Sequence, residues 1–521
     1  MTEFSTVELA RVSVELTSPL SIGSGESDLL SDAPVVRDAQ GLPTIPATSM
    51  IGVLRSLWQE GHTDQETEAL FGYQKRDEGA RSMVEASSGV IHDSHDCPVS
   101  PFADWHSDPL LQSAGSDRLI RDHVRLNHRG VVDGRGKFDR ASIHKGHRFT
   151  FELTLRRRSS PEAGEPQKGD LGRILDLLSS TVCRFGAKTR SGLGSFKVVR
   201  CSMSTFDLTN KEDFNRYLSL PRGLHHPCSL EEYKTNRVEN THSITIELKP
   251  EEAWLQGGGD QSKHSIDGRG PKIVPYQERS VTWRGMGRDQ KGSIDELDQD
   301  DFVLTGTSIR GALRHRTAFH FRRLIQHWSN PGLKRLEHVQ EQGLDSLDPS
   351  VLKGFDMLFG QLNKSNTAGG QELGWRGSLL TSDVRVKEKN STLQVSDHLS
   401  IDRFSGAPMQ GHLFSDAAIA ADTQVIPLEL GFIPPRLSEH DSALADALNV
   451  ACYALSFTIK DLSRGRLQLG AGSGRGYGYF SAVTSTWSVN LNSPWVSALN
   501  GVCPSSDVIA RVTEMNKIVE G

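Results

Sequence analysis

The sequence is poor in cysteine, has no long apolar run and lacks a signal-like start, and each absence excludes a class of protein. Its six cysteines are scattered over 521 residues, which excludes a disulfide framework and predicts reduced thiols. No run of about 18 apolar residues is present. No basic segment followed by an apolar one opens the sequence. We therefore expect a cytoplasmic protein with no membrane partner.

The chain also lacks a positive net charge, because 59 basic residues face 65 acidic ones and give a formal charge of −6. This balance weighs mildly against RNA binding, but a protein binds RNA through a local surface rather than through its average charge. Basic residues do gather between residues 118 and 158. A solvated face is the ordinary interpretation of such a run, and RNA contact is the alternative.

Four segments of the first half recur in the same order in the second half, which indicates duplication of a whole domain. We expect a first domain over residues 1–205, a linker over 206–240, a second domain over 241–485 and a tail over 486–521. The matched pairs are Ile45–Trp58 with Leu304–Arg316, Leu70–Gly72 with Leu358–Gly360, Asp122–Leu155 with Asp397–Phe432, and Arg184–Val199 with Leu469–Val483.

Short alternating strands with a few helices between them predict α+β domains. Opening strands are expected at Arg11–Leu16 and Ser243–Leu248. The first pair of segments predicts amphipathic helices capped by their Thr-Ser pairs, and the third predicts a polar hairpin followed by a strand. Gly52 and Gly311 lie inside the predicted helices, where glycine costs about 1 kcal/mol relative to alanine. Their recurrence predicts that something packs closely there.

Three stretches of the first half carry a family resemblance: PLSIGSG…SDAPVVRDAQGLPTIPATSMIGVLR, DHVRLN…GKFD and RFGAKTRSGLGSF. They resemble the opening strand and helix, the thumb-like hairpin and the glycine-rich loop of the RAMP superfamily of CRISPR-associated proteins. The most similar member is the backbone subunit of type III effector complexes. The resemblance spans most of residues 10–205 and, more loosely, residues 241–485.

The resemblance implies an α+β fold of two tandem ferredoxin-like (RRM-like) RAMP domains with hairpin and loop insertions. It also implies a place along a CRISPR guide RNA, beside other type III effector subunits, in a prokaryotic cytoplasm. A complementary target RNA is the second implied nucleic-acid partner. Fused double-backbone chains of this kind resemble the type III-D arrangement.

In the resembled subunits, an aspartate in the loop after the first strand supports metal-dependent cleavage of target RNA, and Asp32 matches that position. RNA carries its own nucleophile, the 2′-hydroxyl, so one loop carboxylate suffices to assist proton transfer or to hold a metal. The resemblance therefore implies Asp32 as a catalytic residue and as a ligand of Mg²⁺ or another divalent cation. The alternative for Asp32 is a turn residue. Asp267 is the expected equivalent in the second copy, with Asp260 as its neighbour.

The glycine-rich loops are expected to bring backbone N–H groups close to phosphates, with tight turns in a compact sheet as the alternative. The histidine and arginine residues of the third segments are expected at the base of the hairpins. A longer segment before Thr305 holds Arg279, Trp283 and Arg284, a mix that suits RNA stacking or a surface loop. The candidate RNA-binding residues are Arg55, His123, Arg125, Lys188, Arg190, Arg310, Arg314, His398, Arg403 and Arg475.

Two further functions stay open at this stage. Both domains could hold a guide–target duplex and cut nothing, or the chain could be a ribonuclease that matures the guide RNA. The histidine-rich segment His92–Cys97 lacks the paired spacing of a zinc site.

Overall fold

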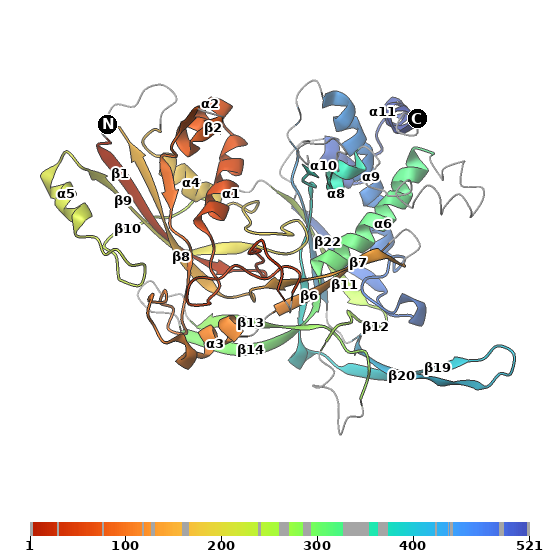
Figure 1. The fold of residues 1–521 in the computed structure, drawn as a ribbon. Helices are drawn as coiled ribbons and strands as arrows, with labels where there is room; N and C mark the ends of the chain where they lie inside the picture. Colours follow the sequence, from red (N-terminus) through yellow and green to blue (C-terminus); the bar gives the residue numbers. More distant parts are fainter. Residues whose placement is uncertain are drawn as a thin grey trace.

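In the computed structural model the chain forms two α+β domains that stand side by side (Figure 1). Each domain has its own hydrophobic core, one around Val12 and Phe151 and the other around Ile246 and Leu428. The structure describes residues 4–517 except 29–30, 76–77, 117–118, 127–130, 159–165, 238–240, 260–269, 285–292, 327–353, 363–373, 422–424, 436, 438–440 and 489–493.

The first domain is built on an antiparallel sheet with β1 (Thr6–Leu16) at its centre. This strand pairs with β8 (Arg148–Arg157) on one side and with β9 (Phe196–Asp207) on the other. Outside β8 lies β4 (Val84–Ala86), so the strands follow the order β9-β1-β8-β4. In chain order these are the fourth, first, third and second strands, which is the ferredoxin-like arrangement.

The second domain repeats this order with β22 (Phe480–Ser488), β11 (His242–Pro250), β21 (Ile426–Phe432) and β17 (Leu379–Thr381). Both halves are therefore ferredoxin-like, and the expected duplication is confirmed in three dimensions. The two opening strands lie where the sequence places them, each a few residues longer than expected.

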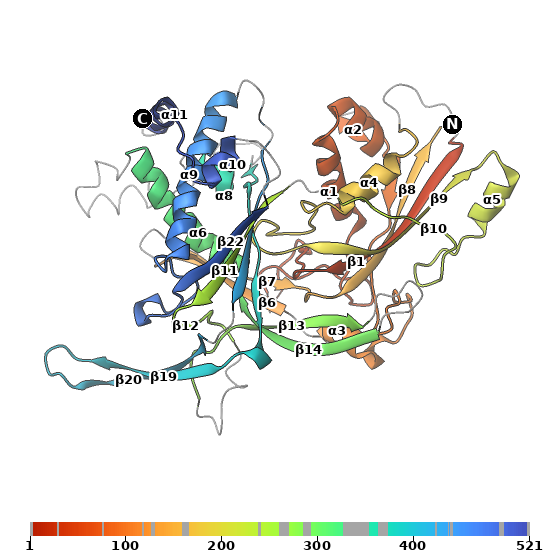
Figure 2. The same ribbon diagram turned by 180° about the vertical axis from the view of Figure 1, so that it is seen from behind.

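Each sheet carries a pair of helices, α1 (Ala47–Gln59) with α4 (Asp170–Leu178) and α6 (Gly306–Leu324) with α9 (Ser442–Ser463) (Figures 1 and 2). The apolar stripe predicted for the first helix is confirmed. Its buried residues are Met50, Leu54, Leu57 and Trp58.

The first helix of each copy begins before its Thr-Ser pair. Thr305 caps α6, because its hydroxyl accepts a hydrogen bond from the N–H of Ser308. Pro46 stands at the same position before α1, with no side-chain cap. The expected caps within the Thr-Ser pairs are therefore wrong, and these pairs lie inside the first turns.

Among the described residues, α9 is the one helix long and apolar enough to cross a membrane, by length and composition. More than half of its apolar window is buried inside the protein. Leu448, Leu455 and Leu462 belong to the core of the second domain, so α9 acts there as a core helix.

Two long hairpins interrupt the sheets. The first consists of β6 (Leu119–Leu126) and β7 (Val132–Ser142), and it lies against the second domain (Figure 1). The second consists of β19 (Leu393–Ile401) and β20 (Pro408–Ala420), and it projects away from both domains (Figure 2). Both hairpins arise from the third pair of repeated segments, as expected.

The longer segment of the second copy forms an extra hairpin, β13 (Gln277–Arg284) with β14 (Ser293–Leu304). It lies beneath the first domain, where Ser280 pairs in parallel with Lys145 (Figure 1). This segment is therefore an element of ordered structure that ties the second copy to the first.

The expected linker and the expected tail both contain elements that are part of the two domains. In the expected linker, β9 continues to Asp207 and β10 (Glu231–Glu232) pairs with it, with α5 (Lys211–Leu218) between. In the expected tail, α10 (Pro494–Leu499) and α11 (Ser506–Lys517) pack on α9.

The remaining elements are short. The Leu-Phe-Gly segments end α2 (Asp64–Phe71) and α8 (Phe355–Phe359), each at a glycine with positive φ. The others are β2 (Tyr73–Lys75), β3 (Glu78–Ala80), β5 (Val90–Ile91), α3 (Pro109–Ser116), β12 (Ala253–Trp254), β15 (Gln361–Leu362), β16 (Gly374–Trp375) and β18 (Val384–Lys387).

Candidate nucleic-acid interface

Asp32 lies on the exposed loop after β1, against the β7 strand of the first hairpin. Its backbone N–H donates to Oδ1 of Asp139 at 2.8 Å. In return the N–H of Asp139 donates to Oδ2 of Asp32 at 3.0 Å. Among the described residues no hydrogen bond reaches Oδ1 of Asp32 or Oδ2 of Asp139. The loop and the hairpin thus hold two carboxylates together, each with one oxygen open to a ligand.

A third acid faces this pair across the hairpin, because Asp122 stands directly opposite Asp139. Like charges opposite each other destabilise a strand pair, and Lys137 offsets part of this cost because its ammonium lies 3.6 Å from the Asp122 carboxylate. Asp139 was not singled out from the sequence, although the Phe-Asp pair of the third segment points to it.

The two carboxylates fit Mg²⁺ better than they fit zinc. Magnesium keeps several waters and is usually held by one or two carboxylates together with substrate phosphates. Zinc usually takes three or four nitrogen or sulfur ligands from the protein. No group of three or more His, Cys, Asp or Glu side chains that could hold a metal occurs in the part of the chain that the structure describes.

Next to Asp122, His123 forms a small aromatic and cationic cluster. Its ring stacks on Phe138 with centroids 4.9 Å apart, and the Lys188 ammonium lies 5.5 Å from the Phe138 ring centre. Burial, together with the nearby charges of Lys188 and Arg121, lowers the pKa of His123 to about 4. The ring is therefore neutral at neutral pH, and His123 contributes a stacking surface rather than a charge.

The two glycine-rich loops share the same backbone. Phe185 donates to the carbonyl of Gly194 in the first copy, and Leu469 donates to that of Gly478 in the second. A Cβ on Gly194 would lie 1.9 Å from the Phe185 oxygen, so only glycine fits there. The tight-turn interpretation is therefore confirmed, while contact with phosphate stays a prediction.

One residue departs from this shared loop. Lys188 has a φ of 55° at the position where the second copy has Gly472, with a φ of 79°. A left-handed backbone costs a non-glycine residue about 1–2 kcal/mol. The first copy thus places an exposed lysine where glycine would be less strained, which points to a function for the side chain.

Arg310 is used inside the protein, which corrects its expected contact with RNA. Its guanidinium donates to the carbonyls of Leu379 at 2.6 Å and Phe359 at 2.8 Å. It also donates to the Arg190 carbonyl of the first copy at 3.3 Å. Burial, with the nearby charges of Arg190 and Arg314, lowers its pKa to about 9. Arg310 therefore fastens the second copy to the glycine-rich loop of the first.

Arg55 and Arg314 occupy matched positions on the first helix of each copy, three residues after Gly52 and Gly311. A Cβ on either glycine would meet no atom of the described residues within 4 Å, so no described part of the chain packs closely there, and the expectation that something else does stays a prediction. Both arginines are half-buried, and Arg314 lies 5.7 Å from the Phe355 ring centre. Each of these two helices therefore has an uncovered face at its glycine, next to an arginine.

In the second copy, His398 and Arg475 both lie against a buried acid. Asp416 is fully buried, with His398 Nε2 and Arg475 Nε each 3.0 Å from its carboxylate oxygens. The hydroxyl of Tyr477 donates to the same carboxylate at 3.0 Å. The expected phosphate contacts of His398 and Arg475 are corrected accordingly, because the Asp416 carboxylate pairs with the Arg475 guanidinium and lies 3.0 Å from the His398 ring nitrogen.

The two remaining arginines lie on the hairpins. Arg125 is exposed on β6. Arg403 lies in the turn at the tip of the second hairpin rather than at its base, 5.1 Å from the ring centre of Phe404. Phe404 is 87% exposed. This tip offers an unshielded cation and ring to a partner.

Asp260 and Asp267 lie outside the described residues. The neighbouring backbone still locates the counterpart of Asp32. Ala141 of β7 donates to the carbonyl of Ala33, and its counterpart in β20 donates to the carbonyl of Ile273. Lys272, the residue before Ile273, therefore occupies the position of Asp32. In this register Lys272, and not Asp267 as expected, corresponds to Asp32, and Asp267 lies outside the described residues.

A buried ion network joins the first hairpin to the second domain. Arg121 of β6 donates to Glu278 and to Asp383, each at 2.6 Å, and at most 4% of any of these side chains is exposed. Arg385 pairs with Glu278 from the other side. Burial alone would raise the pKa of Glu278, but Arg121 and Arg385 outweigh it and hold this pKa well below its usual range. Part of the basic run therefore forms a joint rather than a solvated face.

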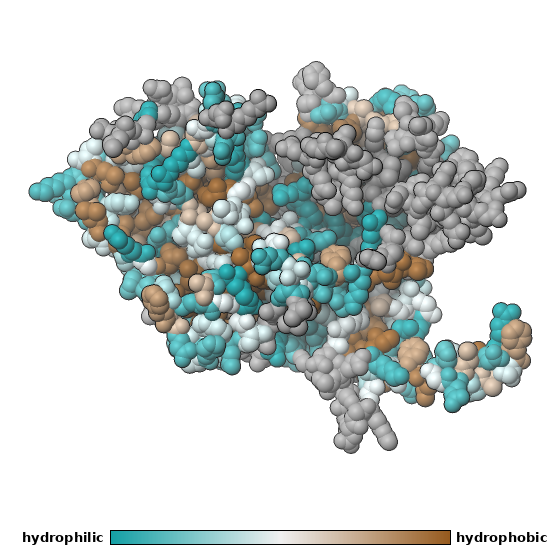
Figure 3. All heavy atoms as spheres, in the orientation of Figure 1, coloured by the Kyte–Doolittle hydropathy of each residue, from teal (hydrophilic) through white to brown (hydrophobic). Residues whose placement is uncertain are grey.

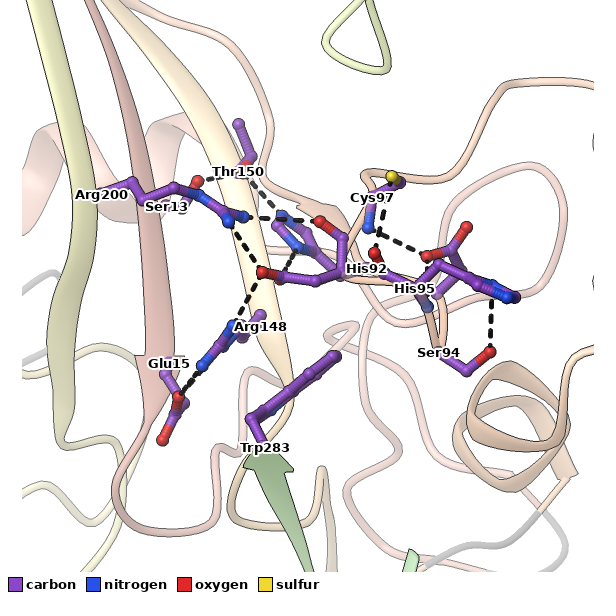
Figure 4. Close-up of polar contacts among 12 residues, drawn as sticks. Ser13, Glu15, His92, Ser94, His95, Cys97, Arg148, Thr150, Arg200 and Trp283 are labelled. Carbon is purple, nitrogen blue, oxygen red and sulfur yellow. Dashed lines mark hydrogen bonds and ion pairs between the residues drawn. The ribbon is translucent and has the colours of Figure 1, made fainter. Parts of the chain in front are cut away.

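The histidine-rich segment forms a second buried network (Figure 4). His92 bonds Asp96 at 2.8 Å and Thr150 at 2.6 Å. Arg148 and Arg200 donate to the other oxygen of Asp96 at 2.8 and 2.7 Å. Burial lowers the pKa of His92, so its neutral ring donates to Asp96 and accepts from Thr150. The segment is a structural core feature.

This second network also reaches the other copy. Arg148 lies 4.3 Å from the ring centre of Trp283, whose indole N–H donates to the carbonyl of Gly146 at 2.8 Å. The expected stacking of Trp283 on RNA is therefore corrected, because its ring and its only donor are used between the domains.

The sequence model of the RAMP superfamily matches residues 13–197 and 257–481. The two matched regions coincide with the two ferredoxin-like copies and together make up well over half of the chain. A search of curated proteins gave no match. The chain therefore belongs to the RAMP superfamily, as a tandem of two RAMP regions.

Proposed function

We propose that this chain is a backbone subunit of a type III CRISPR ribonucleoprotein, in a III-D-like arrangement, in a prokaryotic cytoplasm. It holds a guide RNA and a complementary target RNA beside other effector subunits. Its first copy cuts the target RNA with the help of Mg²⁺ or another divalent cation. The observation that carries the proposal is the reciprocal bonding of Asp32 and Asp139, which fixes two carboxylates at the base of a hairpin.

The proposed reaction is a transesterification within the target RNA. A 2′-hydroxyl oxygen attacks the adjacent phosphorus, the bond to the 5′-oxygen breaks, and the products are a 2′,3′-cyclic phosphate and a 5′-hydroxyl. The open Oδ1 of Asp32 accepts the 2′-hydroxyl proton, and water returns a proton to the leaving oxygen. Asp32 and Asp139 would hold the cation, which when bound supplies charge stabilisation at the phosphate.

Several surfaces support the RNA-holding part of the proposal. The faces of α1 and α6 are open at Gly52 and Gly311, each beside an arginine. An interior glycine lowers the stability of a helix, and the missing side chain leaves room for an RNA backbone to approach that face closely. Lys188, in its strained conformation beside Phe138, adds a cation and a ring to this path.

The projecting hairpin supports the presence of neighbouring subunits. Figure 3 shows apolar residues interspersed with polar ones along this hairpin, out to its tip. An exposed apolar set on a projecting element is costly in water unless a partner covers it. These exposed residues are Val395, Leu399, Ile401, Phe404, Met409 and Leu413.

The test uses the complex reconstituted with a guide and an end-labelled complementary RNA, with Mg²⁺ and with EDTA. Asp32→Asn should lower the rate of one metal-dependent cut by about 10²-fold or more while target affinity is unchanged. Asp38→Asn is the matched control, because the amide can still accept the bonds that the N–H groups of Gln40 and Leu42 donate. If every cut survives in Asp32→Asn, the chain is a scaffold. If the chain alone cuts precursor guide RNA, it is a processing enzyme.

A further inference from the structure

We propose that the second copy is a non-cutting counterpart of the first, in which Lys272 and Ser415 stand where the first copy has Asp32 and Asp139. The inference rests on the proposed function and deepens it, since it assigns cutting to one of the two copies. It predicts one cut per chain on each target RNA.

The loop that carries Asp32 has backbone contacts that recur in the second copy. Val36 donates to the carbonyl of Ile22, and Tyr276 donates to that of Gln256. An isolated bridge joins Gly23 to Val35, and the corresponding bridge joins Gly257 to Pro275. Val35 and Val36 thus correspond to Pro275 and Tyr276, each of which lies 240 residues later in the chain. Position 32 therefore corresponds to position 272.

The hairpins match independently. Asp122 and His123 stand opposite Asp139 and Phe138 in the first copy. In the second copy, Asp397 and His398 stand opposite Ser415 and Phe414. Both histidines pack on their phenylalanines, with ring centroids 4.9 and 5.1 Å apart. Ser415 therefore takes the place of Asp139.

The substitutions remove the chemistry and keep the scaffold. Lys272 is exposed, and its backbone N–H donates to the carbonyl of Ser415 at 2.8 Å, so loop and strand still meet. An ammonium neither accepts the 2′-hydroxyl proton nor binds a divalent cation at neutral pH, but it attracts phosphate. The hydroxyl of Ser415 donates to Asp397 at 2.5 Å, so the one acid left in the position of Asp122 already has a partner.

A neighbouring position shows the same exchange of charge. The residue after Asp139 is Arg140, and the residue after Ser415 is Asp416. Asp416 is fully buried and paired with Arg475, so it cannot replace the missing carboxylates at the surface. The second copy thus has a lysine and a serine at the two positions where the first has an acidic pair.

The decisive experiment transplants the acidic pair. In the reconstituted complex with guide and labelled target, the wild type should make one metal-dependent cut, and Asp32→Asn should make none. The double variant Lys272→Asp with Ser415→Asp should add a second cut, displaced along the target. Asp38→Asn is the control and should leave the single cut unchanged. Melting temperature and target affinity establish that each variant folds and assembles.

Three outcomes would contradict the inference, and they separate it from the proposed function. A second wild-type cut that persists in Asp32→Asn and disappears in Asp267→Ala overturns the inference while the proposed function stands. A folded, target-binding double variant that adds no cut overturns the assignment of Lys272 and Ser415. A wild-type complex that cuts nowhere contradicts the proposed function, and the inference falls with it.

Discussion

The two copies share one backbone and differ in charge at the same few positions. The first has Asp32, Asp139 and Lys188 where the second has Lys272, Ser415 and Gly472. The strand order and the turns of the glycine-rich loop are the same in both. The two copies therefore share a backbone hydrogen-bond pattern while the side chains at one surface differ in charge, with one reversal of sign and two losses of charge.

The copies also differ in how they use their arginines. In the first hairpin, Arg121 is buried against Glu278 and Asp383 of the second domain. In the second copy, Arg475 neutralises Asp416 of its own domain. The first hairpin thus serves as an internal joint, while the second projects from the molecule (Figure 1).

The largest expected effect comes from breaking the joint. Arg121→Met removes the ion-pair partner of buried Asp383 and leaves buried Glu278 with Arg385, and we expect a loss of about 3–5 kcal/mol in unfolding free energy. Arg125→Met in the exposed part of the same strand should change it by at most about 0.5 kcal/mol. Urea unfolding measures both, and equal effects would refute the joint.

The next largest effect is the dependence of stability on pH that His123 causes in the first copy. The folded-state pKa of His123 is about 4, against an ordinary value of 6.5. The unfolded chain therefore binds the proton first, and this contribution, full above pH 6.5, is lost as the pH falls towards 4. A shift of this size corresponds to about 3 kcal/mol. His123→Phe should weaken the dependence of the melting temperature on pH between pH 6.5 and 4, while the same substitution of the exposed His106 should not.

A smaller effect tests the strained loop position in both directions. Lys188→Gly should stabilise the protein by about 1 kcal/mol, and Gly472→Lys should destabilise it by at least about 1 kcal/mol. Lys188→Gly should at the same time weaken RNA binding and reduce its salt dependence. Unfolding and binding titrations separate the two effects, and a Lys188→Gly protein with unchanged RNA affinity would leave the strain without a function.

The smallest effect concerns the open helix faces. Gly52→Ala and Gly311→Ala should each stabilise the free chain by about 0.5–1 kcal/mol, because a Cβ meets no atom there. Both should weaken guide binding if RNA approaches these faces. Gly194→Ala is the contrasting variant, since its Cβ would collide with the Phe185 oxygen and destabilise the chain. Unchanged guide affinity in both helix variants would place the RNA elsewhere.

The sequence predicts much of the fold because repeats and apolar periodicity are local signals. It predicts the hairpins, the opening strands and the apolar stripe of α1. It does not predict Lys272, because Pro275 lies 18 residues after Gly257 while Val35 lies 12 residues after Gly23, so counting from a glycine fails across the longer loop. Arg310 and Trp283 resemble RNA ligands in sequence, but their partners are distant in the chain: Trp283 donates to Gly146 of the other copy, and Arg310 donates to Leu379 and Phe359 of its own copy and to Arg190 of the other. Contacts between domains leave no local pattern.

The most direct test of the central claim maps every new RNA end made by the wild-type complex and by Asp32→Asn on one labelled target. We predict a single pair of ends in the wild type, a cyclic phosphate and a 5′-hydroxyl, and none in Asp32→Asn with target binding intact. Cleavage of the wild-type pattern that persists in Asp32→Asn would contradict the assignment of cutting to the first copy.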